Sequence, residues 1–294
     1  MKKEYTLKQD GFRAVWYEGT INRDKAIIYM SGAGCGEEVT FEMSQYLVKN
    51  GYSVLCLGFY LWKGLPNKMY NIPVEYVERA VAELKRNGFD KIAIHGMSTG
   101  AGYALLCSSL IPDITCTLAV VPYDYVMEGV AGTIFPQNCS VYTYKGRDIP
   151  YSKFPILHSN LIKELKKYYS IPKSERKGLM RYSYDTSEHA EQGRIKVENM
   201  NSDVLLLGVN NDDCWPSEMA VPRMEKILEN SNYPHRVKAL VYEKGSHFIG
   251  CADVPEKLKR LKNIMFSNEK RFPNECNKTR KDSQKQILDF LNEW

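Results

Sequence analysis

The chain has 294 residues, of which 44% are hydrophobic and 26% are charged, and its formal net charge is +5. This composition excludes a disordered chain, and the length suits one large α/β domain or two small ones. No apolar run reaches the roughly 18 residues that a membrane span needs, and the basic first ten residues lack the apolar stretch of a signal peptide, so we expect a cytoplasmic protein.

Cysteine spacing and charge bear on cofactors and partners. None of the eight cysteines forms a C-x-x-C pair, so zinc-ribbon and thioredoxin-type sites are disfavoured, and free thiols suit a reducing compartment. Residues 257–285 hold ten Lys and Arg against three Asp and Glu but no nucleic-acid motif. We interpret them as a solvated helical face; attraction to an anionic cofactor such as coenzyme A stays open. We expect a small-molecule substrate, no nucleic acid, no metal ion and no cofactor.

Strand-like and helix-like segments alternate along the chain, which predicts βαβ units and a mostly parallel sheet. The predicted strands cover residues 26–30, 53–57, 91–95, 115–121, 204–209 and 237–242, with 12–16 as an antiparallel edge strand. Apolar residues at helical spacing predict helices at 40–49, 74–84, 221–228 and 283–291. The fold class is therefore α/β.

The alternation stops between residues 128 and 196. This segment is rich in proline and tyrosine, contains one helical pattern at 157–169, and is too long for a plain loop. We interpret it as a cap inserted into a single domain that spans residues 1–294. Its aromatic residues either line an acyl pocket or form the cap's own small core, and both alternatives stay open: Phe135, Tyr142, Tyr144, Tyr151 and Phe154.

The run Gly96-Met97-Ser98-Thr99-Gly100 is the strongest functional motif in the chain. It lies between a strand-like run and a run of small apolar residues at helical spacing. A serine on such a strand-to-helix turn is the nucleophile elbow of an α/β-hydrolase. The glycines are needed because the turn strains the serine backbone and leaves room only for minimal side chains. The motif predicts a nucleophilic Ser98; the alternative is an ordinary turn with a spare serine.

A serine nucleophile needs a histidine base and a carboxylate that orients the base. In this fold class they follow in the order serine, acid, histidine. Only His247 follows the last predicted strand, in a Gly-Ser-His loop. Asp212 and Asp213 both follow strand 204–209, and the spacing to the next Trp-Pro pair favours Asp212. The other histidines precede that strand or lie in the insertion: His95, His158, His189 and His235.

Acyl transfer also needs hydrogen-bond donors for an oxyanion. The amide of Thr99, directly after the nucleophile, is one candidate. The glycine-rich loop 31–36 supplies the second, for which Ala33 is our first choice and Gly34 the next. Because glycines allow close approach of the backbone, we expect Gly32 and Gly34 to contact substrate, together with Met97 of the elbow.

With these motifs in place, the chain resembles the C-terminal catalytic domain of acyl-CoA thioesterases and bile-acid-CoA:amino-acid N-acyltransferases. The resemblance runs from about residue 26 to the C-terminus and rests on the glycine loop and on residues 51–55, 194–200, 212–217 and 245–249. It implies an α/β-hydrolase acting on an acyl thioester. Eukaryotic members carry an N-terminal β-sandwich, which we expect to be absent here. The acyltransferase branch tends to use cysteine at the elbow, so Ser98 implies transfer to water.

We therefore expect a serine hydrolase that cleaves an acyl-CoA-like thioester through an acyl-enzyme. Two alternatives keep the same machinery: a carboxylesterase or lactone hydrolase of the dienelactone-hydrolase type, and an acyl-CoA N-acyltransferase. A non-catalytic binding protein on a hydrolase scaffold is the fourth possibility. It is disfavoured because a binding protein needs neither the serine, nor the acid, nor the histidine.

Overall fold

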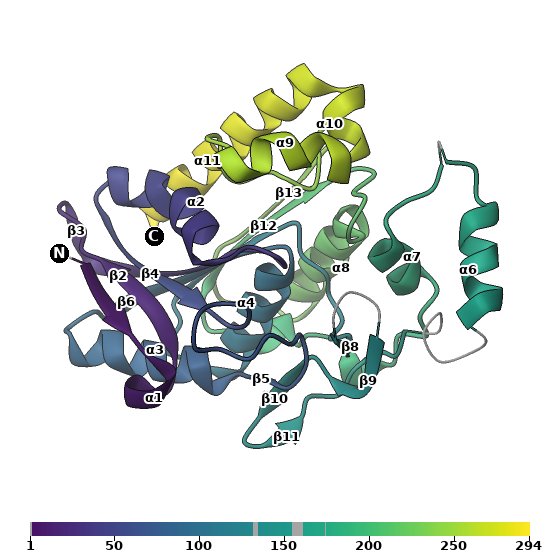
Figure 1. Ribbon diagram of the computed structural model, residues 1–294. Coiled ribbons are helices and arrows are strands. Elements are labelled where there is room, and N and C mark those ends of the chain that lie inside the picture. The colour runs from purple at the N-terminus through teal and green to yellow at the C-terminus, as the bar shows by residue number, and fades with distance from the viewer. Residues whose placement is uncertain (1, 132–134, 155–160, 174) are drawn as a thin grey trace.

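A twisted central sheet with helices on both faces dominates the computed structural model, which describes residues 2–131, 135–154, 161–173 and 175–294 (Figure 1). Within the described residues the sheet has eight strands in the order β1-β2-β4-β3-β6-β7-β12-β13. Their bounds are β1 (Lys2–Tyr5), β2 (Arg13–Tyr17), β3 (Asn22–Met30), β4 (Tyr52–Gly58), β6 (Lys91–Met97), β7 (Cys116–Val120), β12 (Asp203–Val209) and β13 (Val237–Tyr242). The strands from β4 to β13 pair in parallel, and β1 and β2 add an antiparallel edge.

The helices connect these strands. They are α1 (Leu7–Asp10), α2 (Glu37–Lys49), α3 (Glu75–Arg86), α4 (Thr99–Leu110), α6 (Leu161–Ser170), α7 (Leu179–Asp185), α8 (Ser217–Asn230), α9 (Glu256–Met265), α10 (Ser267–Arg271) and α11 (Pro273–Glu293). Every strand and helix predicted for the sheet and its two faces is confirmed, although several helices begin earlier than the apolar pattern suggests. Strand β1 was not predicted, because its run Lys-Lys-Glu is charged and has no apolar alternation; pairing with β2 makes it an edge strand.

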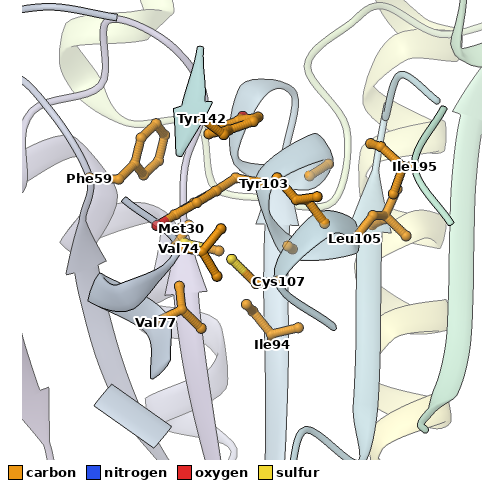
Figure 2. Packing of buried hydrophobic residues seen from close by; sticks show 14 of the residues in the cluster. Met30, Phe59, Val74, Val77, Ile94, Tyr103, Leu105, Cys107, Tyr142 and Ile195 are labelled. Atoms are coloured by element: carbon orange, nitrogen blue, oxygen red, sulfur yellow. The ribbon is translucent and has the colours of Figure 1, made fainter. Parts of the chain in front are cut away.

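The core has two layers, one on each face of the sheet. Neighbouring strand residues point to opposite faces. Ile28 therefore belongs to the layer that includes residues of α3, α4 and α8, whereas Ile27 belongs to the layer that includes residues of α2 and α11. Figure 2 shows the first layer, where Tyr103 of α4 lies between the strands and Tyr142. Each fully buried large side chain contributes about 1.5–3 kcal/mol to folding, so the sheet is a rigid base for the loops at its carboxyl edge.

The insertion after β7 folds into short strands and helices. The strands are β8 (Glu128–Ala131), β9 (Phe135–Ser140), β10 (Tyr142–Tyr144) and β11 (Arg147–Asp148), with β10 pairing to β5 (Ile72–Pro73). Part of the predicted helix 157–169 is present as α6, while residues 155–160 lie outside the described residues. Tyr142 and Phe154 are buried in the main core, and the Tyr144 hydroxyl donates to Glu78 of α3 over 3.1 Å. For these three side chains the structure favours a packing role over a pocket lining.

The basic stretch 257–285 is not only a solvated face. It forms α9, α10 and much of α11, and two of its cations, Lys262 and Arg280, form ion pairs with the fully buried carboxylate of Glu269. In the part of the chain that the structure describes, no helix is both long and apolar enough to cross a membrane.

Candidate active site

Ser98 lies on a strained turn between β6 and α4. Its backbone has φ 56° and ψ −121°, a region that non-glycine residues rarely occupy. The Ser98 amide donates to the Val120 carbonyl over 2.8 Å, which ties the turn to β7. A methyl group added at Gly96 would lie 2.0 Å from the Gly100 carbonyl oxygen, and one added at Gly100 would lie 2.5 Å from the Ser31 carbonyl oxygen. Both positions of the motif therefore require glycine.

Ser98, His247 and Asp212 form one hydrogen-bonded series. The distance from Ser98 Oγ to His247 Nε2 is 2.8 Å, and His247 Nδ1 lies 2.8 and 2.9 Å from the two carboxylate oxygens of Asp212. The three residues are only 7%, 4% and 0% exposed, respectively, so bulk water hardly competes for these contacts. They meet because they follow β6, β13 and β12, whose carboxyl ends lie at the same edge of the sheet.

The Asp212 carboxylate is fixed by three further donors. Oδ1 accepts from the amides of Cys214 and Trp215 over 2.9 and 3.3 Å, and Oδ2 accepts from the Ser217 hydroxyl over 2.7 Å. An ionised carboxylate can only accept hydrogen bonds, so His247 must hold its proton on Nδ1. Nε2 is then free to accept the hydroxyl proton of Ser98. This arrangement suits a base acting on a nucleophile.

Asp213 faces away from the histidine. Its carboxylate accepts from the Ser267 amide over 2.8 Å and from the Ser267 hydroxyl over 2.9 Å. Ser267 is the first residue of α10, so Asp213 caps the N-terminus of that helix and not of α8, the next helix in the chain. Of the two neighbouring acids, the structure brings only Asp212 to His247.

Arg181 of α7 anchors the loop that carries Asp212. Its guanidinium is buried and donates to the carbonyl oxygens of Asp212 and Trp215 over 2.9 and 3.2 Å. It also donates to Glu218 over 2.9 Å and to Asp185 over 2.8 Å. Sequence reasoning missed this residue, because nothing in the local pattern of α7 distinguishes Arg181 from a surface arginine.

A charged cluster anchors the loop that carries His247. The Ser246 hydroxyl donates to the buried carboxylate of Glu269, which also pairs with Lys262 and Arg280. Burial by itself raises the pKa of Glu269, but the hydrogen bonds from Lys262 and Ser246 and the charge of Arg280 leave it below its ordinary value. Asn268 donates to the Gly245 carbonyl over 2.8 Å. The short helix α10 thus contacts both the loop that carries Asp212 (the acid loop) and the loop that carries His247 (the histidine loop).

The glycine-rich loop lies beside Ser98. A methyl group added at Gly32 would be 3.1 Å from Ser98 Cβ, so this glycine is placed as expected for a substrate-contacting backbone. The Ala33 amide has no hydrogen-bond partner within the described ranges of the chain. The Gly34 amide instead donates to the Tyr60 hydroxyl over 2.6 Å, which weakens the case for Gly34 as an oxyanion donor or substrate contact.

The structure favours Thr99 as an oxyanion donor but not Met97 as a substrate contact. The Thr99 amide opens the first turn of α4, where amides have no intrahelical acceptor. The Thr99 hydroxyl is buried and has no partner among the described residues. Met97 is 5% exposed and packs into the core beneath α2 and α11, so the expectation that it contacts substrate is not supported by its position.

The other described histidines are held in structural contacts. His95 Nε2 lies 2.9 Å from the Tyr46 hydroxyl, and burial lowers the pKa of its imidazole to about 3. His189 lies 3.2 Å from the Ser152 hydroxyl, and His235 lies 3.0 Å from Asn201 Oδ1. His158 falls outside the described residues. Cys214 lies beside Asp212 and His247. Burial and the charges of Asp212 and Asp213 raise the pKa of its thiol well above the ordinary value.

Comparison with known proteins identifies the family. Residues 72–291 match the family model described as BAAT / Acyl-CoA thioester hydrolase C terminal. A peroxisomal succinyl-coenzyme A thioesterase of Mus musculus is 25% identical over 208 residues, which cover 68% of this chain and 43% of that protein. This chain spans less than half the length of the curated relatives that it matches, 42–48%.

Solved structures that cover the whole chain share its fold. One, assigned as a dienelactone hydrolase of Klebsiella pneumoniae, superposes with a TM-score of 0.53 at 14% identity and covers 100% of this chain and 99% of that one. An esterase of Pyrococcus furiosus superposes with a TM-score of 0.52 at 17% identity and covers 100% and 92%, respectively. At these identities the likeness shows the fold alone, which is that of an α/β-hydrolase.

Proposed function

Because the chain belongs to the family of the BAAT / acyl-CoA thioester hydrolase C-terminal domain, as the match over residues 72–291 shows, we propose that it hydrolyses acyl-CoA-like thioesters through an acyl-enzyme. Ser98 is the nucleophile, His247 the base and Asp212 the orienting acid. The observation that carries the proposal is the buried series of 2.8 Å contacts from Ser98 Oγ through His247 to Asp212. Matched relatives named as acyl-coenzyme A thioesterases support the choice of a thioester.

The first half of the reaction forms the acyl-enzyme. Ser98 Oγ attacks the thioester carbonyl carbon while its proton passes to His247 Nε2. The amides of Thr99 and Ala33 donate to the oxyanion of the tetrahedral intermediate. When the carbon–sulfur bond breaks, His247 returns the proton to the leaving sulfur, which departs as a thiol. Asp212 keeps Nδ1 protonated throughout and stabilises the transient imidazolium.

The second half releases the acid. A water molecule gives a proton to His247 and attacks the acyl carbon, and the ester bond to Ser98 Oγ breaks as His247 returns that proton to the oxygen. Water is the acceptor because an oxygen ester at Ser98 is hydrolysed by the same base and oxyanion donors that formed it. Eight free cysteines suit a reducing compartment, and we place the activity in the cytoplasm.

We further propose that residues 128–196 form a cap over this site within one domain that spans residues 1–294. Two contacts of the segment support a cap. The Gly178 amide donates to the Asp213 carbonyl over 2.9 Å, and the Tyr142 hydroxyl donates to the carbonyl of Thr99 over 3.2 Å. Together with Arg181, these contacts join the segment to the acid loop and to the first residue of α4, next to the nucleophile.

The activity is tested by offering matched acyl groups as CoA thioesters, p-nitrophenyl esters and lactones, with and without an amino-acid acceptor. We expect the thioesters to be turned over with release of one free thiol and one carboxylic acid. Preferred turnover of esters or lactones would favour an esterase of the dienelactone-hydrolase type, and an amide product would indicate an acyltransferase. A binding protein would turn over none of them and would not react with a fluorophosphonate probe.

The role of Ser98 is tested by Ser98→Ala, which we expect to lower kcat by roughly 10⁴–10⁶ because only binding and oxyanion stabilisation remain. Ser109→Ala is a matched control on the same helix, since within the described residues Ser109 Oγ donates only to the Leu106 carbonyl at the far end of α4. A folded Ser98→Ala variant with near-native turnover would overturn the assignment.

The cap is tested by the acyl-length profile. Tyr151→Ala removes a partly buried ring of the insertion, whereas Tyr144→Ala removes one that contacts α3. Because each buried methylene contributes about 0.8 kcal/mol, we expect Tyr151→Ala to shift selectivity by a few-fold per carbon and Tyr144→Ala to leave it unchanged. An unchanged profile in both variants would mean that selectivity lies outside the insertion.

A further inference from the structure

The geometry points to an inhibitory zinc site built on the proposed catalytic residues, with Asp212, Cys214 and His247 as its ligands. This inference rests on the proposed function, since it concerns how His247 would be prevented from acting as a base. It adds a ligand that the hydrolysis itself does not use. The cysteine spacing predicts no such site, because the ligands lie on two loops 35 residues apart that only the fold brings together.

The three side chains form a compact set of donor atoms. One ligand atom from each of them lies within 4.8 Å of the other two, and His247 Nδ1 is already 2.8 Å from Asp212 Oδ1. A tetrahedral Zn²⁺, with bonds of about 2.0–2.1 Å to nitrogen and oxygen, needs these two atoms roughly 3.3 Å apart. Binding therefore requires the histidine and the acid to separate by about half an ångström. It also requires the Cys214 sulfur, which lies within 4.8 Å of the other two ligand atoms, to approach them to about 3.6 Å, the spacing set by a Zn–S bond of about 2.3 Å.

The mixture of donors selects the metal. A thiolate, an imidazole and a carboxylate are the ligands of Zn²⁺, whereas Mg²⁺ and Ca²⁺ prefer oxygen alone. The negative charge of Asp213 lies next to Cys214 and favours a cation, while the guanidinium of Arg181 opposes it but is directed at the Asp212 carbonyl oxygen. Cys214 is partly exposed as a residue, unlike Asp212 and His247. Because burial and the neighbouring carboxylates raise the pKa of its thiol, the metal must displace the thiol proton on binding.

Zinc at this position removes the catalytic base. Zn²⁺ takes the Nδ1 lone pair, so the neutral imidazole must carry its proton on Nε2 instead. Nε2 then donates to Ser98 Oγ and cannot accept the hydroxyl proton. The Cys214 thiol loses its proton to solvent as the sulfur–zinc bond forms, and nothing is oxidised or reduced. Since the metal lies behind the imidazole, substrate still binds, and inhibition lowers kcat without raising KM.

Binding is tested first, without reference to activity. Wild-type protein, free of added thiols, is titrated with Co²⁺ as a probe for Zn²⁺ and dialysed against Zn²⁺. We expect one bound ion per chain and a thiolate-to-cobalt charge-transfer band that Cys214→Ser and Cys214→Ala remove. Cys139→Ser is the matched control, since Cys139 is a partly exposed cysteine of the insertion. Absence of a bound ion, or a band that depends on Cys139, would overturn the site.

Inhibition is tested by initial rates of thioester absorbance loss, because a thiol reagent would compete for the metal. We expect Zn²⁺ to lower kcat at constant KM, EDTA to restore it, and both Cys214 variants to need at least about tenfold more Zn²⁺, each relative to its own metal-free rate. Equal sensitivity of wild type and variants would refute the inference while leaving the proposed function intact. If the protein shows a cobalt band that depends on Cys214 but does not turn over thioesters, the proposed function is refuted and the metal site is not.

Discussion

Replacing Asp212 by asparagine tests the acid of the proposed triad with the smallest change of shape. The Oδ1 atom of Asp212 accepts from the amides of Cys214 and Trp215. An asparagine must keep its oxygen there, because its NH₂ group would face two donors. The NH₂ group then occupies the Oδ2 position beside His247 Nδ1. We expect the imidazole to accept from this NH₂ group and to move its proton to Nε2, giving up its hydrogen bond to the oxygen at the Oδ1 position. The base is then lost although every atom is nearly in place.

The expected cost follows from that change of tautomer. A triad histidine held in the wrong tautomer loses about 10⁴ in kcat, which corresponds to about 5.5 kcal/mol at the transition state. Asp213→Asn is the matched control one residue away. Its carboxylate binds the exposed Ser267 and does not contact His247. We expect its kcat to stay within a few-fold of wild type, because exposed contacts of this kind contribute at most about 1 kcal/mol.

Steady-state kinetics on the best acyl-CoA substrate measure both variants, and circular dichroism with urea unfolding checks that each is folded. The diagnostic result is a large fall in kcat for Asp212→Asn with KM little changed. The reasoning would be refuted if Asp213→Asn lost as much activity as Asp212→Asn. It would also be refuted if a folded Asp212→Asn variant stayed within about tenfold of wild type, a loss of only about 1.4 kcal/mol.

Three further predictions concern the surroundings of the site. Arg181→Met removes a buried cation and should lower the free energy of unfolding, measured in urea, by about 3 kcal/mol or more. Arg176→Met, at a partly exposed position, should lower it by less than about 1 kcal/mol. Equal losses in the two variants would contradict the anchoring role of Arg181. His95 is neutral in the folded protein, where its pKa is about 3 against an ordinary 6.5. Its contribution to the free energy of unfolding is therefore fully present above pH 6.5. It falls by up to roughly 1.4 kcal/mol per pH unit as the pH drops toward 3, because the unfolded chain binds the proton first. His95→Gln should flatten that slope in unfolding measurements, and an unchanged slope would exclude His95 as its source. Gly32→Ala adds a methyl group 3.1 Å from the Cβ of Ser98 and should lower kcat by about 10–100-fold. Gly36→Ala, where the added methyl has open space, should leave kcat unchanged. Similar kcat values in the two variants would contradict a functional need for the close approach of Gly32 to Ser98.

The insertion after β7 shows where sequence reasoning fails. Proline, tyrosine and the broken alternation correctly indicate an interruption of the sheet, but they do not say which rings face a substrate and which face the core. The burial of Tyr142 and Phe154 follows from packing on α4 and its neighbours, which lie far away in the sequence. Met97 is a similar case, since its place in the motif suggests a substrate contact while the strand direction turns it into the core.

The sequence by itself determined the order of strands and helices, the elbow around Ser98, and the candidate acid and base on loops after later strands. These features are local: strand and helix periods, glycines at a strained turn, and residues that follow an apolar run. Only the tertiary structure decided that Asp212 rather than Asp213 meets His247, that Arg181 and α10 anchor the two loops, and that Cys214 stands beside both residues. Apart from the short step from Asp212 to Cys214, these contacts join segments that are 23 to 54 residues apart. Their meeting depends on the parallel strand order and on how each loop turns at the sheet edge, which no local pattern encodes.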